Sequence, residues 1–466
     1  LQSGRYAEAA ERYARAAEAG TDPALAERAT EVALMAHSLD VAALALARWQ
    51  VLAPDAPEAL AAAVVLGMRR GDAGAARAGL DALVAADADT AWGIGVQALA
   101  RAGASPALPA LIEGLRADDA IPSDLPLWLA LASLAQRHGA EEAAAGLIEG
   151  AVERFPDNPR TWLLQAGQLR ERGQAGPARE AIARALAHAG DDLGLRMAAA
   201  GELDRLGDPA AAAAALASGA QSDPTWSARA GYLARAEDEA GLEALYSELA
   251  AVEGEPGSQR AMLLGQLSEY LGRNEEALRW YRGVTEGEPS QRARLRIAVV
   301  LERAGRADEA IGHLRDLQHD FDADGEQILD SYLLEADVHT RRADHPAAVA
   351  AFGRGLEIFE EDPRLLYGRA LARERMDDIA GAEADLRLIL ATDPENVAAL
   401  NALGYTLADR TDRFEEALGY IEAAFALDPD NPAIIDSLGW VLFRLGRAEE
   451  ALVHLERAFE AYQNAE

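Results

Sequence analysis

Two successive stretches near the C-terminus repeat one pattern of small, apolar and polar positions within residues 397–459. Leu403 and Gly404 in the first stretch correspond to Leu438 and Gly439 in the second. Three further positions recur 34 residues apart, pairing Ala417, Ile421 and Ala424 with Ala451, Leu455 and Ala458. A fixed period of this size, with small residues at set points, predicts helix–turn–helix repeats that stack into a solenoid.

The same pattern gives the phase of the rest of the chain. A glycine at the turn between two helices is followed by alanine, a bulky residue and a small residue on the second helix. Residues 125–158 and 258–290 match best upstream, whereas residues 24–56 and 225–257 are degenerate copies. The chain opens inside a copy, and about thirteen copies follow this half-copy at the period of such repeats. We therefore predict a single continuous array over residues 1–466.

The small residues have a physical reason. Half of the residues are hydrophobic but only 6% are aromatic, and the surplus is alanine. Where the first helix of a repeat crosses the second, the backbones approach so closely that larger side chains would hold them apart. Glycine at the turn ends a helix in the left-handed conformation, and proline after the second helix stops it. The pattern predicts an all-α fold.

The order of these residues resembles the tetratricopeptide repeat (TPR) family, in which an aromatic residue or leucine precedes Leu-Gly, then alanine, a bulky residue, alanine and proline. The two stretches that carry the resemblance read NALGYTLADRTDRFEEALGYIEAAFALDPDNP and DSLGWVLFRLGRAEEALVHLERAFE. The resemblance implies a right-handed superhelical solenoid of about thirteen repeats, a fold that presents surfaces and rarely performs reactions.

The charge balance restricts the partners. The formal net charge is −34, which disfavours nucleic acid and anionic membrane surfaces and favours a basic or neutral protein partner. This acidity has two open explanations, a functional acidic surface or a compositional habit of the source genome. Every basic residue is arginine and cysteine is absent, which excludes a Walker A lysine, a Schiff base, disulfides and thiolate metal sites.

Few strings in the sequence suggest chemistry. Gly93 and Gly95 with Ala98 form a G-x-G-x-x-A string, but it lies inside a predicted helix without a preceding strand. His339 and His345 fall near one turn, where we expect them to be solvated. The sequence therefore predicts no catalytic constellation, no enzyme activity and no cofactor.

An acidic string at a long repeat junction resembles the start of a calcium-binding loop. Asp320, Asp322, Asp324 and Gly325 give D-x-D-x-D-G, but Ser331 stands where such a loop supplies a bidentate glutamate. An ordinary acidic turn is the alternative, and we assign no metal site.

Arginine recurs near the ends of the first helices. It has two open interpretations, a ladder of donors for a bound peptide or a cation placed favourably at a helix C-terminus. The positions are Arg137, Arg205, Arg303, Arg341, Arg375 and Arg444.

The resemblance also implies a binding face. In TPR arrays the concave face is built mainly from first helices, at positions flanking the Leu-Gly pair. An aromatic cluster there contributes buried area at low entropic cost, although its rings could instead pack between repeats. Carried onto this chain, the partner-binding positions are Asn401, Tyr405, Asp436, Trp440, Phe443, Tyr367, Asp337 and Met262.

Within the family, the chain is similar to bacterial outer-membrane lipoprotein TPR proteins, some of which are adaptors of a periplasmic carboxyl-terminal processing protease. This implies a non-catalytic scaffold that binds the protease, presents its protein substrates, or both. The implied location is the periplasm, with a lipid anchor upstream of Leu1, and cytoplasmic placement is the alternative. We also expect the native chain to continue beyond Glu466, because the last copy lacks a polar solvating helix. Two other functions stay open, a scaffold for exopolysaccharide export or pilus assembly and a metal- or ligand-responsive sensor centred on the Asp320 loop.

Overall fold

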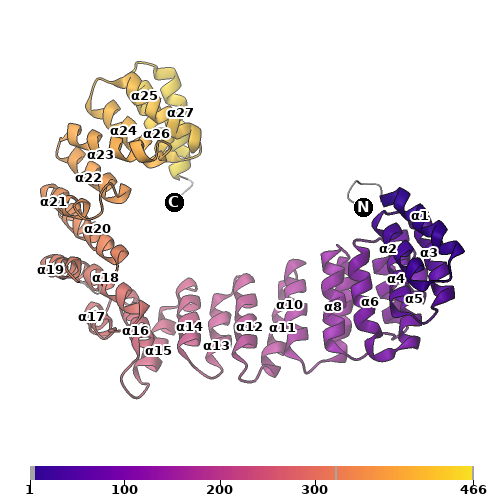
Figure 1. Ribbon diagram of the computed structural model, residues 1–466. Coiled ribbons are helices and arrows are strands. Elements are labelled where there is room, and N and C mark those ends of the chain that lie inside the picture. The colour runs from indigo at the N-terminus through magenta and orange to yellow at the C-terminus, as the bar shows by residue number, and fades with distance from the viewer. Residues whose placement is uncertain (1–5, 321–322, 464–466) are drawn as a thin grey trace. The chain divides into compact units, whose positions relative to one another are not determined.

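The computed structural model describes residues 6–320 and 323–463, which form 27 helices and no strands. The chain divides into two compact units, Leu1–Asp238 (unit 1) and Glu239–Glu466 (unit 2). The boundary falls inside the degenerate copy at residues 225–257. In Figure 1, unit 1 runs from indigo to magenta, and unit 2 continues to yellow.

Unit 1 contains fourteen helices within its described residues. The helix α1 (Tyr6–Ala19) is the second helix of the opening half-copy. The first helices of the following pairs are α2 (Pro23–Met35), α4 (Pro57–Arg70), α6 (Ala88–Ala102), α8 (Leu125–Arg137), α10 (Pro159–Glu171), α12 (Leu193–Arg205) and α14 (Asp223–Arg235). The second helices are α3 (Leu39–Leu52), α5 (Ala73–Ala86), α7 (Leu108–Ala117), α9 (Glu141–Arg154), α11 (Ala175–His188) and α13 (Pro209–Ala217).

Unit 2 contains the remaining thirteen helices of the described chain. Its second helices are α15 (Glu239–Ala250), α17 (Asn274–Arg282), α19 (Ala307–Gln318), α21 (His345–Leu356), α23 (Ile379–Thr392), α25 (Phe414–Leu427) and α27 (Ala448–Gln463). Its first helices are α16 (Ser258–Tyr270), α18 (Glu288–Arg303), α20 (Gly325–Arg341), α22 (Pro363–Arg375), α24 (Val397–Arg410) and α26 (Pro432–Arg444).

Thirteen helix pairs therefore follow α1 in chain order, which confirms the predicted all-α repeat array and its length. Within unit 1, α4 packs on α5 and α10 on α11. Within unit 2, α24 packs on α25 and α26 on α27. First helices also contact the first helix of the next pair, as α16 does with α18 and α24 with α26. The first helices thus form a wall over α2–α8 in unit 1, over α16–α22 in unit 2, and again over α24–α26.

Local sequence explains where helices begin and end. Asn431 accepts a hydrogen bond from the Ala433 amide at 3.1 Å, and Pro432 occupies the first turn of α26. At the other end, Gly446 has φ of 78°, and its amide donates to the Phe443 carbonyl at 2.9 Å. This left-handed cap is the turn that the repeating glycine predicts.

A second glycine position is set by packing between a first helix and a neighbouring second helix, of the same pair or of the preceding pair. A Cβ placed on Gly265 of α16 would lie 2.5 Å from Cε1 of Tyr281 on α17, and one on Gly368 would lie 2.4 Å from Cζ of Phe352. The predicted close approach at the small positions is therefore present, with a large side chain of the second helix filling the space.

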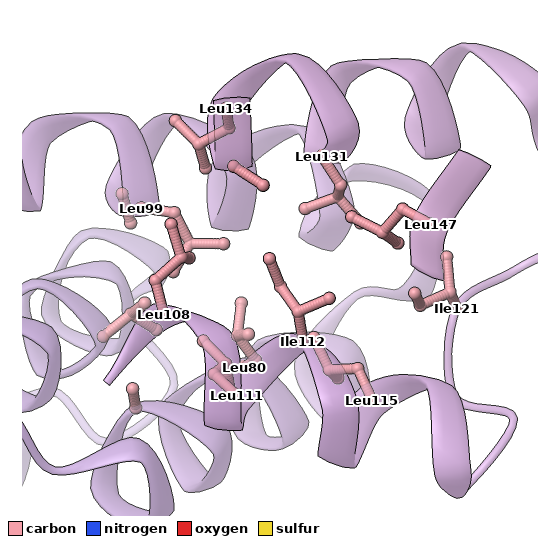
Figure 2. Close-up of a cluster of buried hydrophobic side chains, with 14 of the residues drawn as sticks. Leu80, Leu99, Leu108, Leu111, Ile112, Leu115, Ile121, Leu131, Leu134 and Leu147 are labelled. Carbon is pink, nitrogen blue, oxygen red and sulfur yellow. The ribbon is translucent and has the colours of Figure 1, made fainter. Parts of the chain in front are cut away.

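The core consists of apolar side chains that neighbouring helices share. Figure 2 shows part of it in unit 1, where Leu99 of α6, Leu108 of α7, Leu131 of α8 and Leu147 of α9 point toward one interior. All four are almost completely buried. No helix pair encloses this interior alone, so the pairs stabilise one another.

Unit 2 also buries charge. Glu335 of α20 is inaccessible to solvent and accepts hydrogen bonds from Arg315 at 2.7 Å, Gln318 at 2.9 Å and Arg354 at 2.6 Å. These donors come from α19 and α21, so a single carboxylate joins three consecutive helices. The buried carboxylate of Asp385 is bound in the same manner by arginines of α22.

Candidate functional site

The predicted partner-binding residues all lie on first helices of unit 2. Because α16, α18, α20 and α22 contact in succession and α24 contacts α26, these helices give the unit a common side, here called the first-helix face. The residues are Met262 on α16, Asp337 on α20, Tyr367 on α22, Asn401 and Tyr405 on α24, and Asp436, Trp440 and Phe443 on α26.

An aromatic cluster occupies the α26 part of this face. The rings of Trp440 and Phe443 stack with centroids 5.8 Å apart and an interplanar angle of 29°. The guanidinium carbon of Arg444 lies 5.7 Å from the Trp440 ring centroid and 4.7 Å from that of Phe414. Phe443 is 55% exposed although Trp440 is largely packed against the core. The cluster is therefore held in place by its own contacts and leaves an apolar ring accessible to solvent.

Two buried polar atoms of α24 and α26 have no hydrogen-bond partner in the described part of the chain. They are Oδ1 of Asn401, an acceptor, and Nε1 of Trp440, a donor. An unsatisfied buried polar group costs about 1–3 kcal/mol. Neither atom is accessible at the surface, so both act on the stability of α24 and α26.

Carboxylates surround Tyr405. Burial raises the pKa of its phenol, and the carboxylates of Asp409, Glu374 and Asp436 raise it further, while Arg410 acts in the opposite direction. The hydroxyl therefore stays protonated and lies within electrostatic reach of three acids from α22, α24 and α26. This part of the first-helix face favours basic or hydrogen-bond-accepting groups.

Two further predicted positions, Tyr367 on α22 and Asp337 on α20, differ in their exposure to solvent. Tyr367 is half-buried, and burial raises the pKa of its phenol. Asp337 is exposed and pairs with Arg341 at 3.1 Å, while Arg341 also reaches Glu302 of the preceding first helix at 3.2 Å. Asp337 is thus part of an ion-pair chain along the wall.

Met262 is buried within the core, at the edge of a hollow of about 610 Å³ between α16 and α18. Three arginines line this hollow, Arg292, Arg296 and Arg303, together with Glu269 and several apolar or aromatic side chains. Sequence reasoning identified Met262 but missed Arg292 and Arg296. Their spacing along α18 was the available signal, because residues four apart share one helix face.

Glu269 organises the hollow. Its carboxylate accepts hydrogen bonds from the Tyr281 hydroxyl at 2.9 Å, from Arg303 at 2.7 Å and from Arg296, whose Nε lies at 3.1 Å. Burial raises the pKa of Tyr281 well above its ordinary value, and the adjacent carboxylate adds to the rise. One acid thus holds two arginines of α18 against α16.

The recurrent arginines occupy the last turns of first helices, as predicted. In unit 2, three of these four arginines also reach the preceding first helix. Arg303 binds Glu269, Arg341 binds Glu302, and Arg444 donates to the Asp409 carbonyl at 3.1 Å. Linking neighbouring first helices is a role that neither interpretation of the sequence included.

The structure also shows where the glycine string and His339 lie. Gly93 and Gly95 lie inside α6, so the G-x-G-x-x-A string is helical as predicted. The expectation for His339 was wrong. It lies in α20, is 7% exposed and sits 3.8 Å from a Glu335 oxygen, because the helix extends through the position predicted as a turn.

At the acidic junction, Asp324 caps α20 by accepting from the Gln327 amide at 2.7 Å, and Asp320 pairs with Arg294. Asp322 lies outside the described residues. Among described residues, no three His, Cys, Asp or Glu side chains are grouped as a metal ion would require. None of the described helices has the length and apolar character needed to cross a lipid bilayer.

Helices that pack in pairs, first helices that contact one another and an accessible aromatic cluster on those helices define an α-solenoid of the repeat class. Residues 411–466 match the family model described as tetratricopeptide repeat, so this stretch carries the TPR pattern. The TPR repeat-containing protein PA4667 of Pseudomonas aeruginosa is 37% identical over 135 residues, which is 29% of this chain. That match spans 23% of the relative's length.

Solved structures resemble the chain more distantly. MamA residues 41 to the end, from Desulfovibrio magneticus RS-1, is 18% identical, with a TM-score of 0.33 over 39% of this chain and 98% of that one. The Cut9–Hcn1 hetero-tetramer structure of the APC/C is 13% identical, with a TM-score of 0.33 over 93% of this chain and 92% of that one. At these values neither likeness bears on function.

Proposed function

We propose that the chain is a non-catalytic protein-interaction scaffold that binds an extended segment of a partner protein on the α24–α26 part of the first-helix face. The observation that carries this proposal is the 55% exposed ring of Phe443, which stacks on Trp440 beside the carboxylates around Tyr405. An extended segment can cover this ring with an apolar side chain and bring basic side chains to the neighbouring acids.

The energetics favour this use of the surface. Phe443 adds a ring whose motion is restricted by its stacking on Trp440, so little side-chain entropy is lost when a partner covers it. The surrounding acids Glu374, Asp409 and Asp436 select a segment that carries basic side chains.

At a finer level, we propose that the partner is a carboxyl-terminal processing protease of the bacterial envelope, one of its substrates, or both. The support is the resemblance of residues 397–459 to the adaptor lipoproteins of that system. The proposed location is the periplasm, with attachment to the outer membrane through a lipid upstream of Leu1. A scaffold for exopolysaccharide export or pilus assembly is the alternative, since it would use the same kind of face.

The test is cross-linking affinity purification from envelope extracts with the wild-type chain and with Phe443→Ser. Phe443 is exposed, so its replacement leaves the core intact. Phe459→Ser on α27 is the matched control, because that ring is 62% exposed but lies on a second helix. We expect at least tenfold less partner with Phe443→Ser and no change with Phe459→Ser.

Equal recovery with both variants would remove the α24–α26 surface from the proposal. If no serine protease with a PDZ domain is recovered with the wild-type chain, the adaptor function is wrong. Recovery of export or pilus components would then favour the alternative scaffold.

A further inference from the structure

We propose that the hollow between α16 and α18, here called the arginine hollow, binds the carboxylate side chains of an acidic segment of a partner protein. The arginine hollow is formed by Arg292, Arg296 and Arg303 above Met262, Leu295 and the ring of Tyr281. This inference rests on the proposed scaffold function but uses residues separate from the α24–α26 surface.

The charge of the hollow is opposite to that of the chain as a whole. The sequence holds 78 acidic and 44 basic residues. The walls of the hollow nevertheless carry three guanidinium groups and one carboxylate, Glu269. A local excess of positive charge in a strongly acidic protein attracts acidic groups over basic ones. In a partner segment that carries acidic and basic side chains, it determines which residues lie at the hollow.

Glu269 shows which ligand the hollow accepts. Its carboxylate is already bound by two guanidinium groups and a phenol, the arrangement expected for charge-assisted recognition of an acid. It is 7% exposed, so it forms the base of the hollow. A single carboxylate offsets the charge of one of the three arginines.

Arg292 and Arg303 retain donors for an incoming acid. In the described part of the chain, Arg303 uses one terminal nitrogen, toward Glu269, and its side chain is 56% exposed. Arg292 pairs with Glu288 one turn earlier at 3.0 Å, with both side chains more than half exposed. An exposed pair of this kind contributes little and exchanges readily for a better-placed carboxylate.

The apolar side chains that line the hollow distinguish a protein segment from a simple anion. Leu295 and the buried Met262 and Tyr281 occupy the walls beside the arginines. The volume of about 610 Å³ falls within the range of about 300–1,000 Å³ that ligand sites occupy. Acidic residues next to a leucine or methionine therefore match both parts of the hollow.

The experiment measures fluorescence anisotropy of a capped, fluorescein-labelled peptide that carries two glutamates beside a leucine. The comparison peptide has glutamine at both positions. With the full chain, we expect at least tenfold tighter binding of the glutamate peptide, and a weakening of that preference between about 50 and 300 mM NaCl. Equal binding of the two peptides would overturn the proposal.

The variants locate the binding. The double variant Arg292→Gln with Arg303→Gln should weaken binding of the glutamate peptide at least tenfold. Arg292→Gln alone, which leaves the contacts of Glu269 unchanged, should weaken that binding several-fold. Arg342→Gln with Arg447→Gln removes the same charge from outside the hollow and should leave binding within twofold. Equal losses in both double variants would show a general charge effect and overturn the proposal.

Competition separates a protein segment from a small anion. Citrate and inorganic phosphate should displace the peptide only at concentrations far above the dissociation constant of the peptide. Displacement by either at comparable concentration would make the hollow a small-anion site and overturn the assignment. A failure of peptide binding at the arginine hollow would not change the proposal for the α24–α26 surface. Phe443→Ser tests that surface alone, so each proposal can fail without the other.

Discussion

Gly404 of α24 lies directly against Ile421 of α25. A Cβ on Gly404 would fall 2.5 Å from Ile421 Cγ1 and 2.9 Å from the Ala417 carbonyl oxygen. Both distances are shorter than any relaxed contact, and the carbonyl belongs to a backbone that cannot rotate away. The glycine of the Leu-Gly pair therefore determines how closely the two helices of a repeat pack.

The first prediction concerns this contact. Gly404→Ala should lower the free energy of unfolding by about 1–3 kcal/mol, because the helices must separate to admit the methyl group. Urea denaturation followed by circular dichroism measures the change.

Gly419→Ala in α25 is the control, since a Cβ there meets nothing within 4 Å. It should instead stabilise the helix, by about 0.5–1 kcal/mol. A Gly404→Ala protein as stable as Gly419→Ala would contradict the packing argument.

The second prediction concerns the turns within repeats. Ala343 has φ of 57°, a conformation that costs a residue with a Cβ roughly 1–2 kcal/mol. Ala343→Gly should raise the free energy of unfolding by about 0.5–1 kcal/mol, because glycine removes the strain but loses more chain entropy. Thermal denaturation should show a higher midpoint for Ala343→Gly and a lower one for Gly446→Ala, whose φ is 78°.

The third prediction concerns pH and Glu335. Burial alone would raise its pKa, but hydrogen bonds from Gln318, Arg315 and Arg354 outweigh burial and lower the pKa below its ordinary value. The depressed pKa stabilises the fold above the unfolded-state value of about 4.3, and this stabilisation is lost as pH falls through the folded-state pKa. The midpoint of urea unfolding should therefore decrease below about pH 4.

Replacing the buried acid tests the same cluster at neutral pH. Glu335→Gln should cost about 3 kcal/mol, because Arg315 and Arg354 lose their shared charge partner. It should also reduce the acid sensitivity of the urea midpoint. Glu309→Gln is the control, since that carboxylate pairs with Arg306 on an exposed surface and should leave the midpoint nearly unchanged. Equal effects of the two variants would show that burial of Glu335 is not the cause.

The fourth prediction separates stability from binding on the first-helix face. Asn401 carries an unsatisfied buried oxygen, while the equivalent position of another copy is Leu295. Asn401→Leu should raise the free energy of unfolding by about 1 kcal/mol, because the unsatisfied oxygen is removed, and should weaken partner capture, because the half-buried amide group belongs to the α24–α26 surface. Denaturation and affinity purification of one variant measure both effects. A more stable protein with undiminished capture would mean that Asn401 does not contact the partner.

The repeat architecture was predictable because its signals are local. Leu403, Gly404 and Ala417 lie within one 34-residue copy, and the turn glycine and the Asn-Pro cap act within a few residues of themselves. The two degenerate copies also form helices, α2 and α3 in one and α14 and α15 in the other. Side chains that contact only their own repeat leave a pattern that a single sequence displays.

The candidate site was predictable only in part. The sequence placed Tyr405 and Trp440 on successive first helices, but their roles in binding stay predictions. Arg292 and Arg296 were missed because their place in the arginine hollow depends on how α18 lies on α16. His339 was placed wrongly because the length of α20 follows from its packing and not from the local turn signal.

The sequence by itself determined the class of fold, the number of helix pairs and the absence of lysine and cysteine chemistry, since these follow from period and composition. Only the tertiary structure decided which charges are buried, which polar atoms lack partners and where arginines gather. Those properties depend on the offset between neighbouring repeats, and that offset is set by the summed packing of many side chains, which no single period of the sequence records.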